Sequence, residues 1–305
     1  MSGSAGAICP VNGRPGRPYC AKQGATYYIE PSSGTIFQSP LPTIAEMASY
    51  LDHEYASGAY RRYAEARDLK IATARRRIAR IQSFAPRRRL LDVGCSCGFF
   101  LEAASDGGFD ISGVELSSAA ISLARPDIRA RIVCGDVNVL LGKSDRRFDV
   151  VTAFDIIEHT HDPARFLREI RAILEPGGLL VVSTPDTGHV LRRLMGRSWP
   201  MLQPLQHTVL FSRQGMAQLL GGCGFRVAAV ESTSKTITLD YLAEQLSATN
   251  SGLYRVLRGL LALAPRRARQ APLSVNIGEF IVFAERLPED SSRTDAGTPG
   301  RRAAR

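Results

Sequence analysis

Between residues 90 and 183, short apolar runs alternate with segments in which apolar residues recur at every third or fourth position. Such runs between turn residues are typical of buried strands, and the recurring pattern is typical of helices packed against them. The predicted strands are residues 90–93, 111–114, 132–133, 148–153 and 179–183, and the predicted helices are residues 99–105, 117–123 and 163–174. This alternation predicts right-handed βαβ units and a parallel sheet with helices on both faces.

The pattern changes on both sides of this region. Residues 1–42 are rich in Gly, Pro and Ser and are expected to be irregular, whereas residues 43–86 have a helical pattern and are expected to form a helical lid. The elements predicted after residue 183 are a helix at 212–223, a strand at 225–231, a helical insertion at 236–272 and a last strand at 275–284. The polar tail, residues 287–305, is expected to be disordered.

Composition narrows the class of protein. The chain is 44% hydrophobic and 22% charged, a globular balance that excludes a disordered or fibrous protein. It has no run of 18 apolar residues, and its first residues lack the apolar core of a signal peptide, so a cytoplasmic location is expected. The six cysteines are scattered, which favours reduced thiols over a disulfide framework.

The net charge is +10, and only four of the 39 basic residues are lysine. The arginine clusters at 75–77 and 87–89 could meet an anionic partner, but solvated helix faces are the preferred interpretation. The sequence contains no recognisable nucleic-acid-binding module, so no nucleic-acid partner is expected.

The strongest candidate for a binding site is the turn after the first predicted strand. Residues 92–98 read Asp-Val-Gly-Cys-Ser-Cys-Gly, so the two glycines are four positions apart. Dinucleotide enzymes have Gly-x-Gly-x-x-Gly, whose second glycine lets the pyrophosphate approach, and Ser96 takes that place here. Asp92 adds a carboxylate that would repel a diphosphate and attract a cationic amine. The turn therefore favours a zwitterionic nucleoside over a dinucleotide.

Two further carboxylates follow predicted strands. Glu115 ends the second strand, 17 residues after Gly98, where an acid can accept hydrogen bonds from both hydroxyls of a ribose. Asp136 follows the third strand, where it could accept from an adenine amino group while Val137 packs against the ring. Ligands of open α/β sheets bind at the carboxyl ends of the strands, so we expect these side chains at one site.

Together with later segments, these residues resemble the class I S-adenosylmethionine-dependent methyltransferases. The later segments are residues 148–159, which end in Asp-Ile-Ile-Glu-His, and residues 175–178, which read Glu-Pro-Gly-Gly. Residues 206–212 and 222–225 are similar to the subfamily that includes ubiquinone-pathway O-methyltransferases and many sugar, lipid and natural-product methyltransferases. The resemblance implies an α/β, Rossmann-like, doubly wound seven-stranded sheet in residues 87–286, with strand order 3-2-1-4-5-7-6 and the last strand antiparallel.

The resemblance also implies roles for individual residues. The methionine part of S-adenosylmethionine would lie against the glycine turn, the ribose at Glu115, the base at the third strand end, and the sulfonium and acceptor after the fourth strand. The expected cofactor contacts are Asp92, Gly94, Cys95, Gly98, Glu115, Leu116, Asp136, Val137, Phe154 and Asp155.

Some relatives carry a zinc ribbon of two Cys-x-x-Cys knuckles before the catalytic domain. Residues 9–13 resemble the first knuckle without its second cysteine, and residues 30–34 resemble the second with both cysteines replaced. Structural zinc needs four ligands, which Cys9 and Cys20 do not supply, so no metal is expected.

Methyl transfer to a hydroxyl needs a base. His159 follows the fourth predicted strand, and His207 lies in a long segment expected to roof the pocket, so either could serve. A structural hydrogen bond for His159 and a packing role for His207 are the alternatives.

Tyr55 and Tyr60 lie in the predicted lid. Tyr55 could cover the sulfonium by cation–π attraction, although packing in the core is the preferred interpretation.

The predicted function is methyl transfer to a small-molecule, saccharide or lipid-linked acceptor, with a hydroxyl oxygen preferred. The alternatives are a non-catalytic S-adenosylmethionine-binding regulatory module, an N- or C-methyltransferase, and a dinucleotide oxidoreductase, which the glycine spacing disfavours.

Residues 253–263 are mainly apolar, with Arg255 and Arg258 among the apolar residues, so they could contact a membrane surface. The preferred interpretation is that they cover the sheet or contact a dimer partner. The sequence leaves the acceptor and the oligomeric state open.

Overall fold

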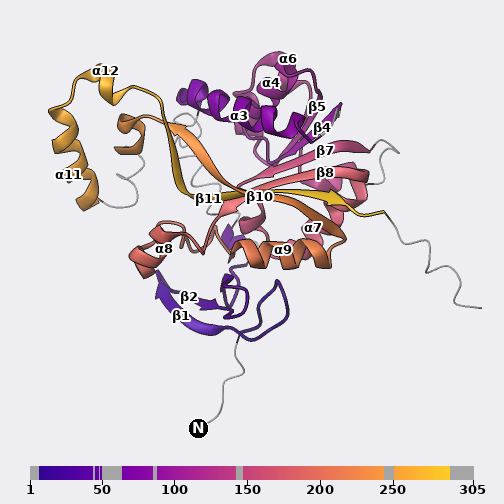
Figure 1. Cartoon of the computed structure of the whole chain (residues 1–305), viewed down its shortest axis with the longest axis horizontal. Coiled ribbons are helices and arrows are strands. Elements are labelled where there is room, and N and C mark those ends of the chain that lie inside the picture. Colours follow the sequence, from indigo (N-terminus) through magenta and orange to yellow (C-terminus); the bar gives the residue numbers. More distant parts are fainter. Residues whose placement is uncertain are drawn as a thin grey trace, which may run out of the picture.

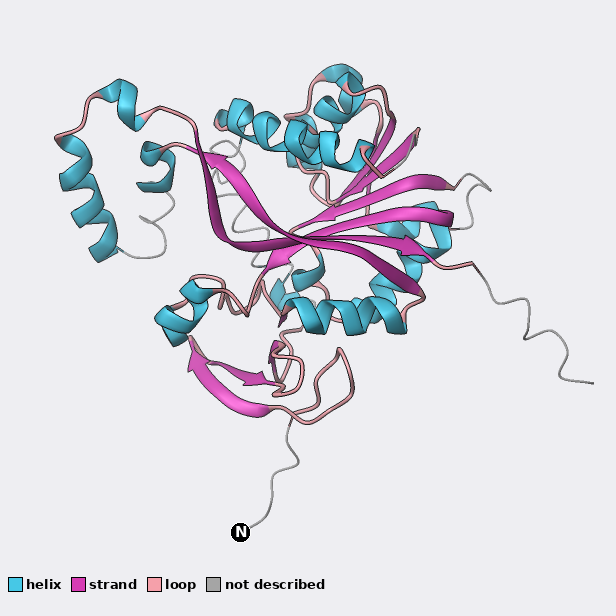
Figure 2. Ribbon diagram, viewed as in Figure 1, coloured by secondary structure: helices cyan, strands magenta, loops and turns pink. Residues whose placement is uncertain are grey.

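The computed structural model describes residues 7–43, 45–47, 49, 64–84, 88–141, 147–243 and 251–288. Of the predicted lid, one helix of more than three residues is described, α3 (Arg67–Gln82). Tyr55 and Tyr60 lie outside the described residues. The described strands form a seven-stranded sheet and a four-stranded sheet (Figure 2).

The seven-stranded sheet has the order β10-β11-β8-β7-β4-β5-β6. Its strands are β4 (Arg89–Val93), β5 (Asp110–Glu115), β6 (Ile132–Cys134), β7 (Phe148–Phe154), β8 (Leu174–Pro185), β10 (Phe225–Ile237) and β11 (Leu273–Arg286). The five strands β6, β5, β4, β7 and β8 are neighbours in this order and are parallel. Strand β11 is antiparallel to both β8 and β10. Numbered in chain order from β4, the strands follow the predicted order 3-2-1-4-5-7-6.

Helices cover both faces of this sheet, as Figure 1 shows. Helices α3 and α4 (Phe99–Asp106) lie on one face, and α7 (Pro163–Ile173) and α9 (Arg213–Gly222) lie on the other. Alternate strand residues belong to two separate cores, because successive side chains of a strand point to opposite faces: Leu90 packs in the α3 and α4 core, and Leu91 packs in the α7 and α9 core. This double burial explains why the strands read as continuous apolar runs.

The N-terminal segment differs from the irregular structure that we predicted. It forms β1 (Arg17–Lys22), β2 (Ala25–Ile29) and β3 (Ile36–Gln38), and β9 (Val209–Leu210) completes this antiparallel sheet. Its core joins Tyr27 and Ile36 to Trp199, Leu202 and Leu210. The strands depend on these distant apolar partners, which the local Gly, Pro and Ser content does not indicate.

The two knuckle-like turns are held by hydrogen bonds. Gly13 N–H donates to Cys9 O (2.9 Å), and Gly34 N–H donates to Glu30 O (2.8 Å). The buried Glu30 carboxylate joins the turns, since it accepts from Asn12 Nδ2 (2.9 Å) and from the Ser33 N–H (2.8 Å). Burial opposes its ionisation, but hydrogen bonds from Ser33, Ser32 and Asn12 outweigh burial and lower the pKa of Glu30 to about 2.

The insertion lies between β10 and β11, as predicted. It contains α11 (Ser251–Ala262) and α12 (Arg266–Arg269), which project from the rest of the molecule at the left of Figure 1. Another short helix, α8 (Val190–Met195), follows β8. None of the described helices is long and apolar enough to cross a bilayer.

Candidate active site

The turn after β4 is tight and cannot accept side chains at its two glycines. Gly94 and Gly98 have φ values of +72° and +73°, in the left-handed region that favours glycine. A Cβ on Gly94 would lie 2.2 Å from Cδ1 of Ile156, and a Cβ on Gly98 would lie 2.7 Å from Cγ2 of Ile128. The side chain of Cys95 packs in the core with α4, so only its backbone faces the turn.

Two of the predicted carboxylates lie at neighbouring strand ends. Glu115 accepts from the Ser96 N–H through Oε2 and from the Ser117 N–H through Oε1, both at 2.8 Å. These bonds fix the carboxylate beside the glycine turn, and each oxygen keeps a second lone pair for a ribose hydroxyl. Asp92 lies on the adjacent strand, where its Oδ1 accepts from the Thr152 hydroxyl at 2.6 Å.

Asp92 is buried, and this changes its protonation. Burial raises its pKa to about 7, with the negative charge of Glu115 adding and the Thr152 hydrogen bond and the charge of Arg77 opposing. A cationic group bound next to Asp92 would favour its ionised form.

The third carboxylate site is more open. Asp136 is exposed and caps a short 3₁₀ helix (Val137–Leu140) by accepting from the Asn138 N–H at 3.0 Å. Val137 is buried beside it, and Leu116 is 64% exposed. The exposed leucine is therefore free to cover a bound base.

Arg77 is a candidate site residue that the sequence did not reveal. Its guanidinium carbon lies 4.2 Å from the centroid of the Phe154 ring, and its charge acts on both Asp92 and Asp155. Its Nε and Nη2 atoms are buried and have no hydrogen-bond partner among the described residues. Buried guanidinium N–H groups of this kind suit a ligand carboxylate.

Asp155 belongs to a partly buried ion-pair cluster. Its backbone has φ +56°, and its carboxylate accepts from Ser183 Oγ (2.9 Å) and pairs with Lys235 Nζ (2.8 Å). Lys235 also pairs with Glu279 Oε1 at 2.6 Å. Lys235 holds the pKa of Asp155 below its usual value although burial opposes this, and burial raises the pKa of Glu279. The cluster fixes Asp155 at the end of β7.

The two candidate bases lie against each other. Thr208 N–H donates to Glu158 O (2.9 Å), which brings the His159 and His207 rings to a centroid distance of 4.8 Å. His159 Nδ1 faces Gln206 O (3.0 Å) and His207 Nδ1 faces Met201 O (2.7 Å), so each Nδ1 must carry the proton. Each Nε2 therefore keeps a lone pair.

Burial lowers the pKa of both imidazoles, that of His207 to about 3, and raises the pKa of Glu158. Ligand atoms of Glu158, His159 and His207 lie within 4.8 Å of one another. Three such ligands with backbone carbonyls behind the imidazoles could also hold a divalent cation after small side-chain movements.

The comparison with known proteins settles the family. A family model described as a methyltransferase domain matches residues 60–230, more than half of the chain. The chain belongs to this methyltransferase family. The matched region contains the glycine turn, the three carboxylates and the two histidines.

Curated relatives of this methyltransferase support the assignment over a shorter region. A ubiquinone biosynthesis O-methyltransferase of Coxiella burnetii is 33% identical over 102 residues, which are 32% of this chain and 43% of that protein. The protein of the same description from Paracidovorax citrulli is 33% identical over 118 residues, 35% of this chain and 49% of its own. The matched region thus spans less than half of the length of these relatives.

Solved structures agree on the fold. A Bacillus halodurans protein assigned as a methyltransferase has a TM-score of 0.51 at 18% identity, covering 70% of this chain and 99% of its own. The methyltransferase in a complex with the Trm112 activator from Haloferax volcanii has a TM-score of 0.52 at 19% identity, covering 78% of this chain and 97% of its own. The chain therefore has the Rossmann-like fold of class I methyltransferases. S-adenosylmethionine is the cofactor that its methyltransferase family implies.

The residues of the methyltransferase fit this cofactor by their chemistry. The amino-acid end of S-adenosylmethionine carries an ammonium group and a carboxylate, and Asp92 and Arg77 offer the opposite charges. Gly94 has no side chain, and Ile156 packs against its Cα, so the turn and the segment after β7 lie close together. The Glu115 carboxylate, fixed by two backbone N–H groups, would accept from the ribose hydroxyls. The complementary charges favour this zwitterionic nucleoside over a dinucleotide.

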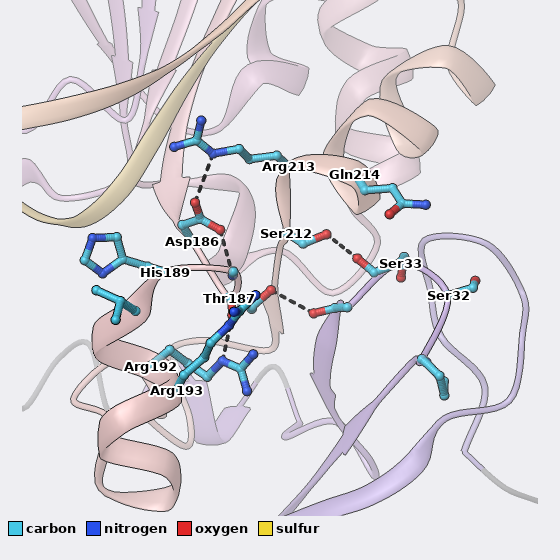
Figure 3. Close-up of a pocket in the computed structure, with 14 residues that line it drawn as sticks. Ser32, Ser33, Asp186, Thr187, His189, Arg192, Arg193, Ser212, Arg213 and Gln214 are labelled. Carbon is cyan, nitrogen blue, oxygen red and sulfur yellow. Dashed lines mark hydrogen bonds and ion pairs between the residues drawn. The ribbon is translucent and has the colours of Figure 1, made fainter.

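A hollow of about 660 Å³ in the methyltransferase lies outside this cluster of residues. The turn at residues 31–34 of the N-terminal sheet, α8 and the start of α9 line it, and none of the predicted site residues does (Figure 3). Across it Thr187 Oγ1 donates to Gly34 O (2.7 Å), and Arg213 Nε pairs with Asp186 Oδ2 (3.1 Å). The first contact joins the N-terminal sheet to the segment after β8, and the second joins that segment to the start of α9.

Proposed function

We propose that this methyltransferase transfers a methyl group from S-adenosylmethionine to a hydroxyl oxygen of a small-molecule, saccharide or lipid-linked acceptor. The observation that carries the proposal is the grouping of Arg77, Asp92 and Glu115 at the carboxyl edge of the sheet, with Phe154 and Asp155 at the next strand end. The O-methyltransferase description of the curated relatives favours oxygen as the acceptor atom.

When bound, the cofactor supplies the methyl group and the leaving group. Arg77 and Asp92 would hold its amino-acid end, and Glu115 would hold its ribose, next to Phe154 and Asp155 at the end of β7. Phe154, stacked under Arg77, excludes water there. Such positioning and alignment of the acceptor supplies a large share of the rate enhancement in a displacement reaction.

His159 is the proposed base, and His207 positions it. Both rings present Nε2 lone pairs, but His207 is only 6% exposed and its pKa of about 3 makes it a weak base. His159 is less buried, and its Nδ1–H is fixed by Gln206 O, which orients Nε2 to take the acceptor proton. Asp155 acts on His159 by raising its pKa against the effect of burial.

The first test measures formation of S-adenosylhomocysteine with a panel of phenol, sugar and polyprenyl-phenol acceptors. His159→Ala should lower turnover about 100-fold or more at saturating cofactor, with cofactor affinity unchanged. His207→Ala should have a smaller effect. Full turnover in His159→Ala would exclude His159 as the base, and cofactor binding without turnover on any acceptor would support a regulatory binding module instead.

A second measurement addresses the cofactor site and the cation alternative. Glu115→Ala should weaken S-adenosylmethionine binding by about 1.5–3 kcal/mol in calorimetry, since charged hydrogen bonds are lost.

The turnover assay is repeated after removal of divalent cations, because Glu158, His159 and His207 lie close enough to share one cation. Turnover that survives supports proton transfer to His159, whereas loss restored by Mg²⁺ or Zn²⁺ would reassign these residues to a metal site.

A further inference from the structure

Helix α8 exposes apolar side chains to solvent. Val190 is 57% exposed, Leu191 is 39% exposed and Leu194 is 78% exposed. Arginines accompany them, and residues 189–199 contain three arginines and no acidic residue. Neither Arg193 nor Arg197 forms an ion pair with any other described residue.

The insertion repeats this composition. Leu260 at the end of α11 is 62% exposed, and Leu263 just after it is 86% exposed. Residues 251–272 contain five arginines and no acidic residue. Arg266 and Arg267 are exposed and unpaired among the described residues, while Arg269 pairs with Asp240 at 3.5 Å.

Both elements leave the sheet at the edge that carries the active site. α8 follows the carboxyl end of β8, and a Cβ on Gly278 of β11 would lie 3.1 Å from Nδ1 of His189, so the start of α8 packs on β11. The β10–β11 hairpin extends past the last β8 pair, Pro185 with Glu279, before it reaches the insertion. In Figure 1, α8, α11 and α12 all lie toward the left of the molecule.

We infer that α8 together with residues 251–272 forms a docking surface for an anionic lipid bilayer. The exposed leucines would enter the boundary between headgroups and acyl chains, and the arginines would lie at the lipid phosphates. A second copy of this chain is a poorer occupant, because like-charged arginines would face one another. The contact is peripheral, since no described helix could span a bilayer.

This surface has a consequence for the acceptor. The carboxyl ends of β4, β5 and β7 hold the cofactor residues, and docking would turn this edge toward the bilayer. A lipid-linked acceptor could then reach the site without leaving the membrane. This consequence rests on the proposed function, whereas the docking itself does not, so vesicle binding is measured without cofactor or acceptor.

The test is sedimentation of the full chain with phosphatidylcholine vesicles that contain either no or 30% phosphatidylglycerol. We expect binding to the anionic vesicles, little binding to the neutral ones, and weakening in high salt because surface charges are screened. Equal binding to both vesicle types, or none to the anionic ones, would overturn the inference.

Variants locate the surface. Arg193→Glu and Arg267→Glu should each lower the vesicle partition coefficient about fivefold or more, the value for one basic residue near an anionic surface. Leu194→Asp and Leu263→Asp should each lower it about tenfold, since one leucine can no longer insert into the bilayer. The matched controls are Arg129→Glu and Leu123→Asp, and Leu123 is 45% exposed. They lie in the segment between β5 and β6, at the far end of the strand order from β10 and β11.

Far-ultraviolet circular dichroism and S-adenosylmethionine affinity are measured for each variant, to separate misfolding from lost docking. If the controls weaken vesicle binding as much as the α8 and insertion variants do, then general basicity and not this surface binds the lipid. If docking fails while turnover on a soluble acceptor persists, the proposed function stands alone. If vesicles bind but no acceptor is methylated, the docking surface stands alone.

Discussion

At the scale of single residues, the site depends on which polar side chains are buried. The three arginines at 75–77 look equivalent in the sequence, yet Arg75 faces solvent, Arg76 bonds to Thr236 Oγ1 at 2.8 Å, and Arg77 turns inward over Phe154. Of these three arginines, only Arg77 has buried N–H groups without a hydrogen-bond partner among the described residues. This distinction makes Arg77 and Asp92 the most informative residues to change.

Replacing Arg77 tests its proposed contact with the cofactor carboxylate. Arg77→Gln should weaken S-adenosylmethionine binding about tenfold or more, since a charged hydrogen bond contributes about 1.5–3 kcal/mol. Calorimetry measures the affinity, and Arg75→Gln is the matched control on the solvent side of α3. An affinity that is the same in both variants would remove Arg77 from the cofactor site.

The pKa of Asp92 predicts a pH dependence of cofactor binding. Because burial raises this pKa to about 7, Asp92 becomes neutral as the pH falls below 7 and no longer attracts the ammonium group. Affinity for S-adenosylmethionine should therefore fall as the pH is lowered from 8 to 6. Calorimetry at several pH values checks this, and Asp92→Asn should bind weakly with no such dependence. A wild-type affinity that stays constant across this range would contradict the assignment.

At the scale of elements, hydrogen bonds to Glu30 hold the two knuckle-like turns of the N-terminal sheet. Asn12 from the first turn and the Ser33 N–H from the second both donate to the carboxylate. A buried carboxylate with several donors can fix such turns without an ion. The turns therefore depend on the ionisation of one side chain.

Glu30 should make the N-terminal sheet sensitive to acid. Its folded pKa of about 2 lies below its ordinary value of 4.5, so its stabilisation is fully present above pH 4.5 and is lost as the pH falls toward 2. Glu30→Gln should lower the free energy of unfolding by about 1.5–3 kcal/mol at pH 7. Urea denaturation at pH 7 and pH 3 measures both effects. Asp127→Asn, at an exposed carboxylate, is the control, and an equal loss in both variants at pH 7 would contradict this role.

At the scale of the whole molecule, the N-terminal sheet and the methyltransferase domain share elements. β9 comes from the segment after β8 but pairs with β3, and the core of the small sheet contains Trp199 and Leu202 from that same segment. Thr187 Oγ1 adds a hydrogen bond to Gly34 O at the junction shown in Figure 3. The small sheet cannot form fully without the larger domain.

This sharing predicts cooperative unfolding. Trp199 is the only tryptophan of the chain and is 2% exposed in the core of the small sheet, so its fluorescence reports on that sheet. Far-ultraviolet circular dichroism reports mainly on the larger domain. The two signals should change at the same urea concentration, as expected for one cooperative unit. Two separate transitions would show that the sheets unfold independently.

The sequence by itself determined the order of strands and helices in the larger domain and the place of its carboxylates. Strands buried on both faces must be apolar throughout, tight turns require glycine, and carboxyl ends of parallel strands meet at one edge, so local patterns carry this information. The N-caps Ser117 and Ser212, at predicted helix starts, accept from the N–H groups of Ala120 and Gly215.

Only the tertiary structure decided which distant residues meet. Lys235 and Glu279 reach Asp155 because β11 inserts antiparallel between β8 and β10, and no local pattern around either residue indicates this. The strands of residues 17–38 likewise form because apolar residues more than 150 positions away cover them. Burial, charge pairing and the direction of a side chain are properties of the packed molecule, and they arise from contacts between segments that the order of residues does not place together.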